Sequence, residues 1–156
     1  MNIRPATPGD YPAYAALFIE INNYHAAAQP ETFAVADTCP RSLEEFTALL
    51  QDPVEAIFVA EIEGQVAGYI HLILRDVQPL AILKPRRLAV VDTVVVGQGF
   101  QRRGAGRALM HAGEQWATRR QAACVELNVW AFNDPALALY DALGYAPISH
   151  KLRKML

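Results

Sequence analysis

Apolar and polar positions in the first quarter of the chain predict a short strand followed by a helix. Residues 3–7 favour an extended backbone, and Asp10 lies where a helix N-cap is expected. Apolar side chains then recur at helical spacing from Tyr14 to Ile21, which indicates an amphipathic helix. Residues 22–40 lose this period and predict a loop with room for one helical turn.

The pattern next predicts a second helix and a β-hairpin. Ser42 followed by Glu45 is a capping-box signature at the start of a helix over 42–50. The apolar segments 57–62 and 66–74 are joined by a Glu-Gly turn, which is the arrangement of a hairpin.

The remaining pattern is a loop followed by strands that alternate with helices. In chain order it predicts a loop at 78–87, a strand at 88–96, a helix from Gly104, a strand at 123–129, a helix from Pro135 to Gly144 and a final strand at 148–156. A block of strands that then alternates with helices is typical of a mixed α/β sheet with helices on both faces. We expect 88–129 to form a parallel, right-handed strand-helix-strand crossover.

Composition and charge exclude several classes of protein. The 156 residues predict a single domain over 1–156, and 53% hydrophobic with 19% charged residues is a globular profile. A net charge of -2 disfavours a general nucleic-acid partner. The two cysteines have no CxxC spacing, so we expect no metal site. Without a signal-peptide or membrane-spanning run we expect a cytoplasmic protein with no membrane partner; a homodimer stays open.

Candidate chemistry begins at VVVGQGFQRRGAGRAL, residues 94–109, where a strand runs into glycines, arginines and a helix start. Backbone N–H groups at a helix N-terminus and nearby cations suit a phosphate group. A nucleoside-triphosphate loop is excluded because Ala105 stands where its Lys is needed. A dinucleotide loop is disfavoured because Arg102 occupies the third glycine position. Each arginine taken alone is equally compatible with a solvated surface.

Two motifs in this region and beyond it resemble a known family. Residues 101–106, Gln-Arg-Arg-Gly-Ala-Gly, match Q-x-x-G-x-G between a strand and a helix. Residues 133–140 match N-x-x-A-x-x-x-Y, and Leu-Gly-Tyr follows at 143–145. The chain therefore resembles the GCN5-related N-acetyltransferase (GNAT) family. The resemblance implies a mixed sheet of about six or seven strands flanked by about four helices, splayed between the fourth and fifth strands.

The resemblance also implies a co-substrate and a reaction. An enzyme of this kind is an acyltransferase that moves an acetyl group from acetyl-coenzyme A to a primary amine of a small molecule or peptide, by direct attack in a ternary complex. The implied coenzyme-binding residues are Val94, Val95 and Val96 through their backbone, and Gln101, Arg102, Arg103, Gly104, Ala105, Gly106, Arg107, Asn133 and Tyr140. Asn133 is equally well placed to cap the last helix.

Two residues are candidates for proton transfer. Tyr140 is the candidate general acid, because a phenol near pKa ~10 still holds a proton that a thiolate of pKa ~8.5 can take. The alternative is a packed core aromatic. Asp92, an acid within an apolar strand, is the candidate base, and the alternative is a structural pairing with Arg86, Arg87 or a hydroxyl. His71 on the neighbouring strand is the rival base, and water is a third option.

The acceptor amine is not identified by the sequence. By resemblance, the candidate acceptor-site residues in the first helices, the loop between them and the loop near residue 80 are Tyr24, His25, Phe33 and Arg86, and His71 on its strand is added to them. His25, Pro30 and Phe33 resemble an H-x-x-x-x-P-x-x-F arrangement of a poorly characterised GNAT subgroup. Small amines, aminoglycosides, amino acids and protein N-termini stay open. The main alternative function is a non-catalytic acyl-CoA-binding or sensing module, which would not need Tyr140.

Overall fold

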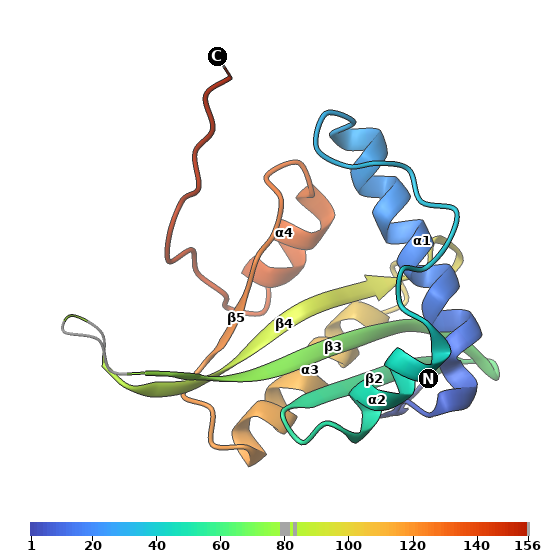
Figure 1. Cartoon of the computed structure of the whole chain (residues 1–156), viewed down its shortest axis with the longest axis horizontal. Helices are drawn as coiled ribbons and strands as arrows, with labels where there is room; N and C mark the ends of the chain where they lie inside the picture. The colour runs from blue at the N-terminus through green and yellow to red at the C-terminus, as the bar shows by residue number, and fades with distance from the viewer. Residues whose placement is uncertain (79–81, 83, 156) are drawn as a thin grey trace.

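The computed structural model describes residues 1–78, 82 and 84–155, and within them the chain forms five strands and four α-helices (Figure 1). The elements are β1 Asn2–Pro5, η1 Pro8–Asp10, α1 Tyr11–Ala28, α2 Leu43–Gln51, β2 Glu55–Ile62, β3 Gln65–Val77, β4 Arg86–Val96, η2 Gln98–Phe100, α3 Ala105–Arg119, β5 Val125–Leu127 and α4 Asp134–Asp141. None of the helices in the described part of the chain has the length and apolar character needed to cross a lipid bilayer.

The strands form one mixed sheet in the order β1-β2-β3-β4-β5. The first four strands pair antiparallel with their neighbours, and β5 pairs parallel to β4 after the α3 crossover. This confirms the predicted mixed α/β fold and its parallel crossover. The prediction of six or seven strands is wrong for the described residues, which form five.

The predicted strand at 148–156 accounts for part of that error. Residues 148–155 have no strand structure and all their side chains are exposed, while residue 156 lies outside the described residues. In an extended backbone Ile148 and Leu152 would share a face with His150 and Lys154. Neither face of the segment is apolar, so it gains little from joining a sheet.

The first helix is longer than predicted. Helix α1 continues to Ala28, so residues 22–28 are helical and not part of a loop. Asn22 and Asn23 interrupt the apolar period, but each donates a side-chain hydrogen bond to the loop that follows, to the carbonyls of Ala34 and Ala36. These contacts stabilise a polar end of the helix that periodicity alone does not detect.

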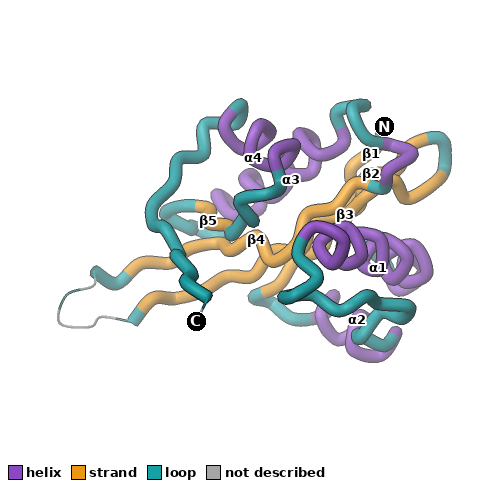
Figure 2. Tube along the Cα trace, turned by 90° about the horizontal axis from the view of Figure 1, so that it is seen from above, coloured by secondary structure: helices purple, strands orange, loops and turns teal. Residues whose placement is uncertain are grey.

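The helices cover both faces of the sheet (Figure 2). Helices α1 and α2 bury an aromatic cluster against one face, with Tyr14, Phe46 and Tyr69 at its centre. Helices α3 and α4 cover the other face, where Leu109 and Tyr140 join an otherwise mostly aliphatic core. Burial of these two layers holds β3 and β4 in the middle of the molecule, where the candidate site lies.

The splay between the fourth and fifth strands is confirmed. The β4–β5 pairing covers only three residue pairs and ends at Val91 and Leu127. Strand β4 continues to Val96 while the chain after β5 turns away toward α4 (Figure 1). The second half of β4 therefore has a hydrogen-bonded neighbour on one side only, β3.

Candidate active site

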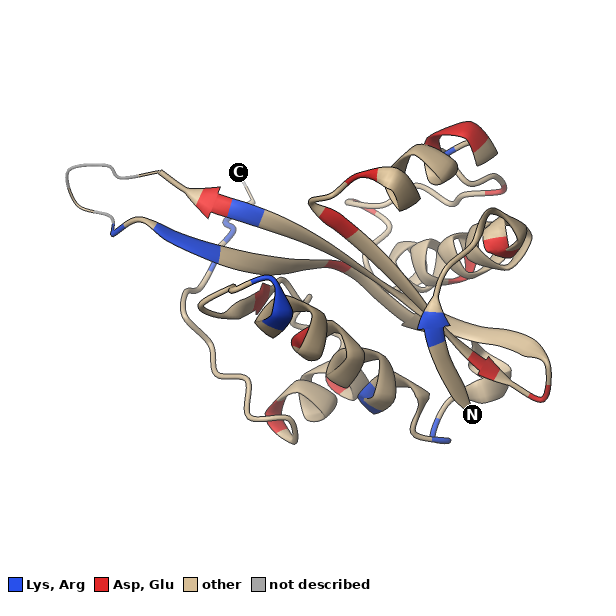
Figure 3. Cartoon of the chain, turned by 90° about the horizontal axis from the view of Figure 1, so that it is seen from below, with Lys and Arg blue, Asp and Glu red and all other residues tan. Residues whose placement is uncertain are grey.

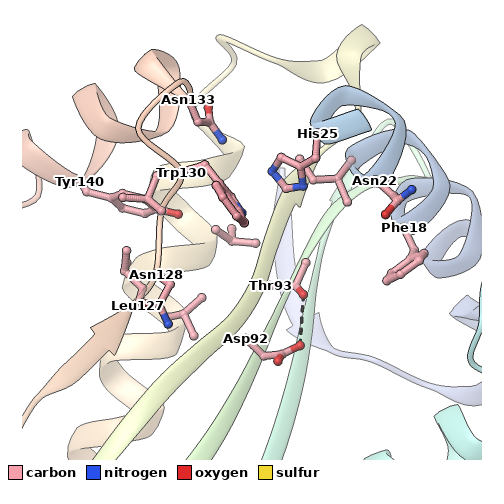
Figure 4. Close-up of a pocket in the computed structure, with 14 residues that line it drawn as sticks. Phe18, Asn22, His25, Asp92, Thr93, Leu127, Asn128, Trp130, Asn133 and Tyr140 are labelled. Carbon is pink, nitrogen blue, oxygen red and sulfur yellow. Dashed lines mark hydrogen bonds between the residues drawn. The ribbon is translucent and has the colours of Figure 1, made fainter. Parts of the chain in front are cut away.

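A cavity of about 270 Å³ occupies the splay between β4 and β5 (Figure 4). It is lined by Phe18, Ile21, Asn22 and His25 from α1, by Val91, Asp92, Thr93 and Val94 from β4, and by Leu127, Asn128, Val129, Trp130, Asn133 and Tyr140 from the last part of the chain. The cavity thus brings together segments that are far apart in the sequence.

The backbone of β4 supplies part of the cavity wall. In an antiparallel pair, successive residues point their N–H and C=O groups alternately toward and away from the partner strand. Because β5 has diverged, the groups between Asp92 and Val96 that point away from β3 face the splay. The side chains of Val95 and Val96 pack into the two cores, while Val94 also lines the cavity.

A β-bulge in β4 positions Asp92. His71 on β3 lies opposite Thr93, and Leu72 lies opposite Val91, so Asp92 is an additional residue in the register. A bulge of this kind reorients side chains and often lies beside a functional site. Here it directs the Asp92 carboxylate toward His71 at the cavity, with 42% of the side chain exposed.

His71 lies behind Asp92 and is almost fully buried. Its Nδ1 lies 3.2 Å from Oδ2 of Asp92, and its Nε2 lies 2.6 Å from Oε2 of Glu55. Thr93 donates a hydrogen bond to the same Asp92 oxygen. The hydrogen bond from His71 holds the pKa of Asp92 below its ordinary value despite partial burial. Among the described residues, no group of three or more His, Cys, Asp or Glu is arranged to hold a metal ion.

Glu55 was not among the residues predicted for the site. The predicted strand began at residue 57, whereas β2 begins at Glu55 itself. An acid at the start of a strand carries no signal in a single sequence, because only the β2–β3 register brings it to His71. Of the expected partners of Asp92, Arg86 pairs with Glu126 and Arg87 with Asp76, whereas the expected hydroxyl is present as that of Thr93.

Tyr140 enters the cavity from α4. Its side chain is 8% exposed and its hydroxyl points into the cavity (Figure 4). Burial raises the pKa of the phenol, so the protonated form persists well above neutral pH. Asn133 caps the same helix, accepting a hydrogen bond from the Ala136 N–H, and also lines the cavity. Its predicted contact with coenzyme stays a prediction.

The glycine-arginine loop follows directly from the end of β4. Gln101 donates a hydrogen bond to the Val96 carbonyl, which ties the loop to the strand. Gly104 has φ +84°, a left-handed conformation that favours glycine. The first helical hydrogen bond of α3 runs from the Ala108 N–H to the Gly104 carbonyl, so the N–H groups before Ala108 point out of the helix end.

The arginines of this loop differ in their contacts. Arg103 forms a 2.6 Å ion pair with Glu63 in the β2–β3 turn and lies over the Phe100 ring. Arg102 and Arg107 are exposed and make no ion pair with any described residue. Both are therefore accessible to an anion at the N-terminus of α3.

Aromatic residues from three segments form a wall above the cavity. His25 stacks on Phe33 at 5.1 Å, and Phe33 meets Trp130 edge-on at 5.0 Å. Phe132 contacts His25 and Tyr24, which is 43% exposed and does not line the cavity. Burial lowers the pKa of His25, which favours the neutral ring. Trp130 and Phe132 belong to the segment before Asn133 but were not predicted as site residues.

Arg86 lies apart from the cavity. It is at the start of β4, on the protruding β3–β4 hairpin, where basic and acidic segments face each other (Figure 3). Its guanidinium lies 3.5 Å from Glu126. The loop near residue 80, expected to border the acceptor site, includes residues 79–81 and 83, which lie outside the described residues.

Comparisons with known proteins agree on one family. The acetyltransferase (GNAT) family model matches residues 20–145. An uncharacterized N-acetyltransferase, YhfO of Bacillus subtilis, is 26% identical over 145 residues, which cover 93% of this chain and 89% of that protein. Another, MJ1207 of Methanocaldococcus jannaschii, is 28% identical over 100 residues, but the match covers 64% of this chain and only 43% of that protein.

Solved structures share the fold at low sequence identity. A mutant of the BH1408 protein from Bacillus halodurans has a TM-score of 0.94 at 24% identity, with 100% of this chain and 99% of that chain covered. The aminoglycoside N-acetyltransferase AAC(6')-Iy, solved in complex with CoA, has a TM-score of 0.73 at 16% identity, with 99% and 98% covered. At these identities the likeness shows a common fold.

Proposed function

This chain belongs to the acetyltransferase (GNAT) family of acetyl-coenzyme-A-dependent N-acetyltransferases, and we propose that it acetylates a primary amine by direct attack in a ternary complex. The observation that carries the proposal is the cavity in the β4–β5 splay. Asp92 on β4 and Tyr140 on α4 both line it, one able to accept a proton and the other to donate one.

The loop between β4 and α3, beyond the residues that line the cavity, fits the phosphates of a coenzyme. The N-terminus of α3 offers backbone N–H groups and a partial positive charge, and a Cβ added at Gly104 would meet only open space. Arg102 and Arg107 add charge-assisted hydrogen bonds. In this proposal residues 101–107 bind the phosphates, while the backbone of Val94–Val96 and the side chains of Asn133 and Tyr140 contact the arm that carries the acetyl group.

The two ionisable side chains then divide the proton transfers. Asp92 takes one proton from the substrate ammonium, and the neutral amine nitrogen attacks the thioester carbonyl carbon. The C–N bond forms as the C–S bond breaks, and Tyr140 donates its phenolic proton to the departing thiolate. The phenol regains a proton from the nitrogen, directly or through water, so that the amide and the free thiol are the products.

The lining favours an acceptor with one positive charge and an apolar body. Asp92 is the single carboxylate among the described lining residues, and Phe18, Ile21 and Trp130 supply apolar surface. A second ammonium group inside the cavity would lose its hydration without gaining a counter-charge. We therefore propose a primary monoamine with an aromatic or aliphatic substituent, in contrast to the aminoglycosides named for AAC(6')-Iy.

A panel of amines with acetyl-coenzyme A tests the proposal. The panel contains 2-phenylethylamine, hexylamine, spermidine and kanamycin, and free thiol is followed with a thiol-reactive dye. We expect amine-dependent thiol release that is fastest with the two monoamines. Preference for kanamycin would contradict the monoamine assignment but not the acetyl transfer. Coenzyme binding by calorimetry without thiol release from any amine would instead favour the non-catalytic binding module.

A further inference from the structure

Three strands contribute one ionisable side chain each to a continuous chain of contacts. Glu55 is on β2, His71 on β3 and Asp92 on β4, and the imidazole lies between the two carboxylates at 2.6 and 3.2 Å. The exposed side-chain fractions are 15%, 2% and 42%, so only the Asp92 end opens toward the cavity. We call this set the Glu55–His71–Asp92 chain.

The number of protons in this chain is constrained by its geometry. A neutral imidazole carries one N–H, so it can donate to one carboxylate only. The other ring nitrogen would then direct its lone pair at a carboxylate oxygen, an unfavourable contact in a buried site. Both contacts are hydrogen bonds only when the three groups share one further proton. The Glu55–His71–Asp92 chain can therefore hold one proton more than a neutral imidazole and two carboxylates carry.

We propose that Glu55, His71 and Asp92 act as a single base, in which Asp92 accepts the amine proton and His71 stores it under the stabilising charge of Glu55. The inference rests on the proposed function. An N–H bond of the ammonium breaks, an O–H bond forms briefly on Asp92, and the proton ends as N–H on Nδ1 of His71. Asp92 is again a carboxylate, and the stored proton returns through Asp92 to solvent after the product has left. Glu55 and His71 are positioning residues, because only Asp92 meets the substrate.

Two observations favour the chain over Asp92 acting alone. While His71 donates to it, the pKa of Asp92 is lowered, so the Asp92 carboxylate alone is a weak base toward an ammonium group. When the shared proton is absent, however, Nδ1 of His71 and Oδ2 of Asp92 face each other without a hydrogen between them. Uptake of the amine proton restores that hydrogen bond, which adds to the driving force for deprotonation.

Other polar groups surround the Glu55–His71–Asp92 chain and affect its protonation. They are Tyr14 and His25 from α1, Cys39 and Arg41 from the segment before α2, Tyr69 on β3, Thr93 on β4 and Tyr140 on α4. Arg41 hydrogen-bonds the Tyr14 hydroxyl, stays charged, and lowers the pKa of Asp92 further. His25 is a second imidazole at the cavity, where burial lowers its pKa, and resonance assignment separates its signals from those of His71.

The first arm of the test measures the shared proton without any amine. Protein labelled with ¹⁵N-histidine is titrated by NMR, and the His71 ring signals are assigned by their loss in His71→Gln. Glu55→Gln removes a negative charge from one side of the imidazolium while keeping the side-chain shape. We expect the His71 midpoint to move to lower pH by about 1–3 units, the usual effect of one close opposite charge.

The second arm measures kcat/KM for the preferred amine against pH. Glu55→Gln should move the ascending limb to lower pH by the same shift as the NMR midpoint, with acetyl-coenzyme A affinity unchanged. His71→Gln should lower kcat by about 10²-fold or more, as expected for loss of base catalysis. The matched control is His111→Gln, because His111 is an exposed histidine on α3 away from the cavity.

Each outcome decides the proposal. A His71 midpoint that does not move in Glu55→Gln, or an ascending limb that stays while the midpoint moves, overturns it. A folded His71→Gln protein with normal kcat overturns it as well. If the wild-type protein releases no thiol with any amine, the proposed function fails, and the NMR arm still shows whether the shared proton exists.

Discussion

The two ends of the candidate site are built in different ways. The phosphate end consists of consecutive residues, 101–107, between β4 and the N-terminus of α3. The proton-transfer end consists of Glu55, His71 and Asp92 on three different strands. Anion binding needs a helix end and small residues, which a local segment can provide, whereas a proton chain needs side chains that only strand register brings together.

The two ends also differ in exposure. Gln101, Arg102, Arg103, Gly104 and Arg107 are exposed, while His71 is buried. A change at the phosphate end should therefore alter coenzyme affinity with little effect on the chemical step. A change at the proton-transfer end should alter kcat and its pH dependence with little effect on affinity. The following substitutions test that separation, from the largest expected effect to the smallest.

Loss of the Tyr140 hydroxyl should have the largest effect. In Tyr140→Phe we expect kcat to fall by about 10²–10⁴-fold, because general acid catalysis acts only in the transition state. The pKa of the phenol is raised by burial, so wild-type activity should fall only at high pH as the proton is lost. That descending limb should disappear in the variant, as measured by steady-state kinetics across pH.

Tyr145 provides the matched control for Tyr140. Its ring packs 5.9 Å from the Tyr140 ring, and its hydroxyl donates to Glu114 outside the cavity. Tyr145→Phe should keep kcat within about twofold of wild type, since surface-side hydrogen bonds rarely affect chemistry at a distance. Near-normal kcat in Tyr140→Phe would show that another group or water supplies the proton.

Substitution of Gly104 should affect the phosphate end of the candidate site. Gly104→Val places a branched side chain at a left-handed backbone position and beside the N-terminus of α3. We expect acetyl-coenzyme A to bind about 10- to 100-fold more weakly in calorimetry, the equivalent of one or two charge-assisted hydrogen bonds. Gly99→Ala is the control, because a Cβ there meets nothing and φ is not positive. Unchanged affinity in Gly104→Val would contradict the phosphate-site assignment.

A substitution away from both ends of the candidate site should change only the free energy of unfolding. Asp10 is buried and hydrogen-bonded by Arg4 and by the Thr7 N–H, and its pKa falls from 3.8 to about 2. Its folded-state pKa is the lower one, so this stability is present above pH 4 and disappears as pH falls toward 2. Asp10→Asn should lose roughly 2 kcal/mol at pH 7 in urea unfolding, with little difference from wild type near pH 2.

Asp76→Asn is the control for Asp10, because its ion pair with Arg87 is exposed and should contribute little. Both variants should leave coenzyme affinity and kcat unchanged at a temperature where they stay folded. A kinetic change in Asp10→Asn would mean that the candidate site is coupled to the packing of α1.

The aromatic wall should have the smallest effect. Phe33→Leu removes the ring contacts with His25 and Trp130. We expect KM for 2-phenylethylamine to rise about 2- to 10-fold, the range of one aromatic pair, with coenzyme affinity unchanged. Val35→Ala, at a highly exposed position of the same loop, is the control. An unchanged KM would show that these aromatic residues do not contribute to binding of the acceptor amine.

The structural features predicted most accurately from the sequence are those that depend on neighbouring residues. The capping box of Ser42 and Glu45 forms as expected at the start of α2, and α3 begins one residue after Gly104. The mixed sheet and the splay also follow the prediction, because the apolar strands and the family resemblance both point to them. The capping box and the start of α3 have their physical cause within a few residues of themselves, whereas the splay was implied by the family resemblance.

The errors occur where distant parts of the chain decide the structure. β5 pairs over Val125–Leu127 only, although apolar alternation continues to residue 129, because β4 leaves the pairing at Val91. The prediction of His71 as a rival base stays a prediction, but the sequence did not show that it lies behind Asp92 with Glu55 on its other side. A single sequence contains no register, so it could not show that these three residues meet.

The bulge at Asp92 is an insertion that the pairing of β3 with β4 does not need. Val91, before it, packs in the core under α3, and Val95, after it, packs in the core under α1, although both have odd numbers. Deletion of residue 92 would therefore leave Thr93 to Val96 opposite the same β3 residues and on the same faces of a regular strand. The sheet should survive this deletion, while the candidate base is removed. A change in length at this one position thus separates the stability of the sheet from the chemistry of the site.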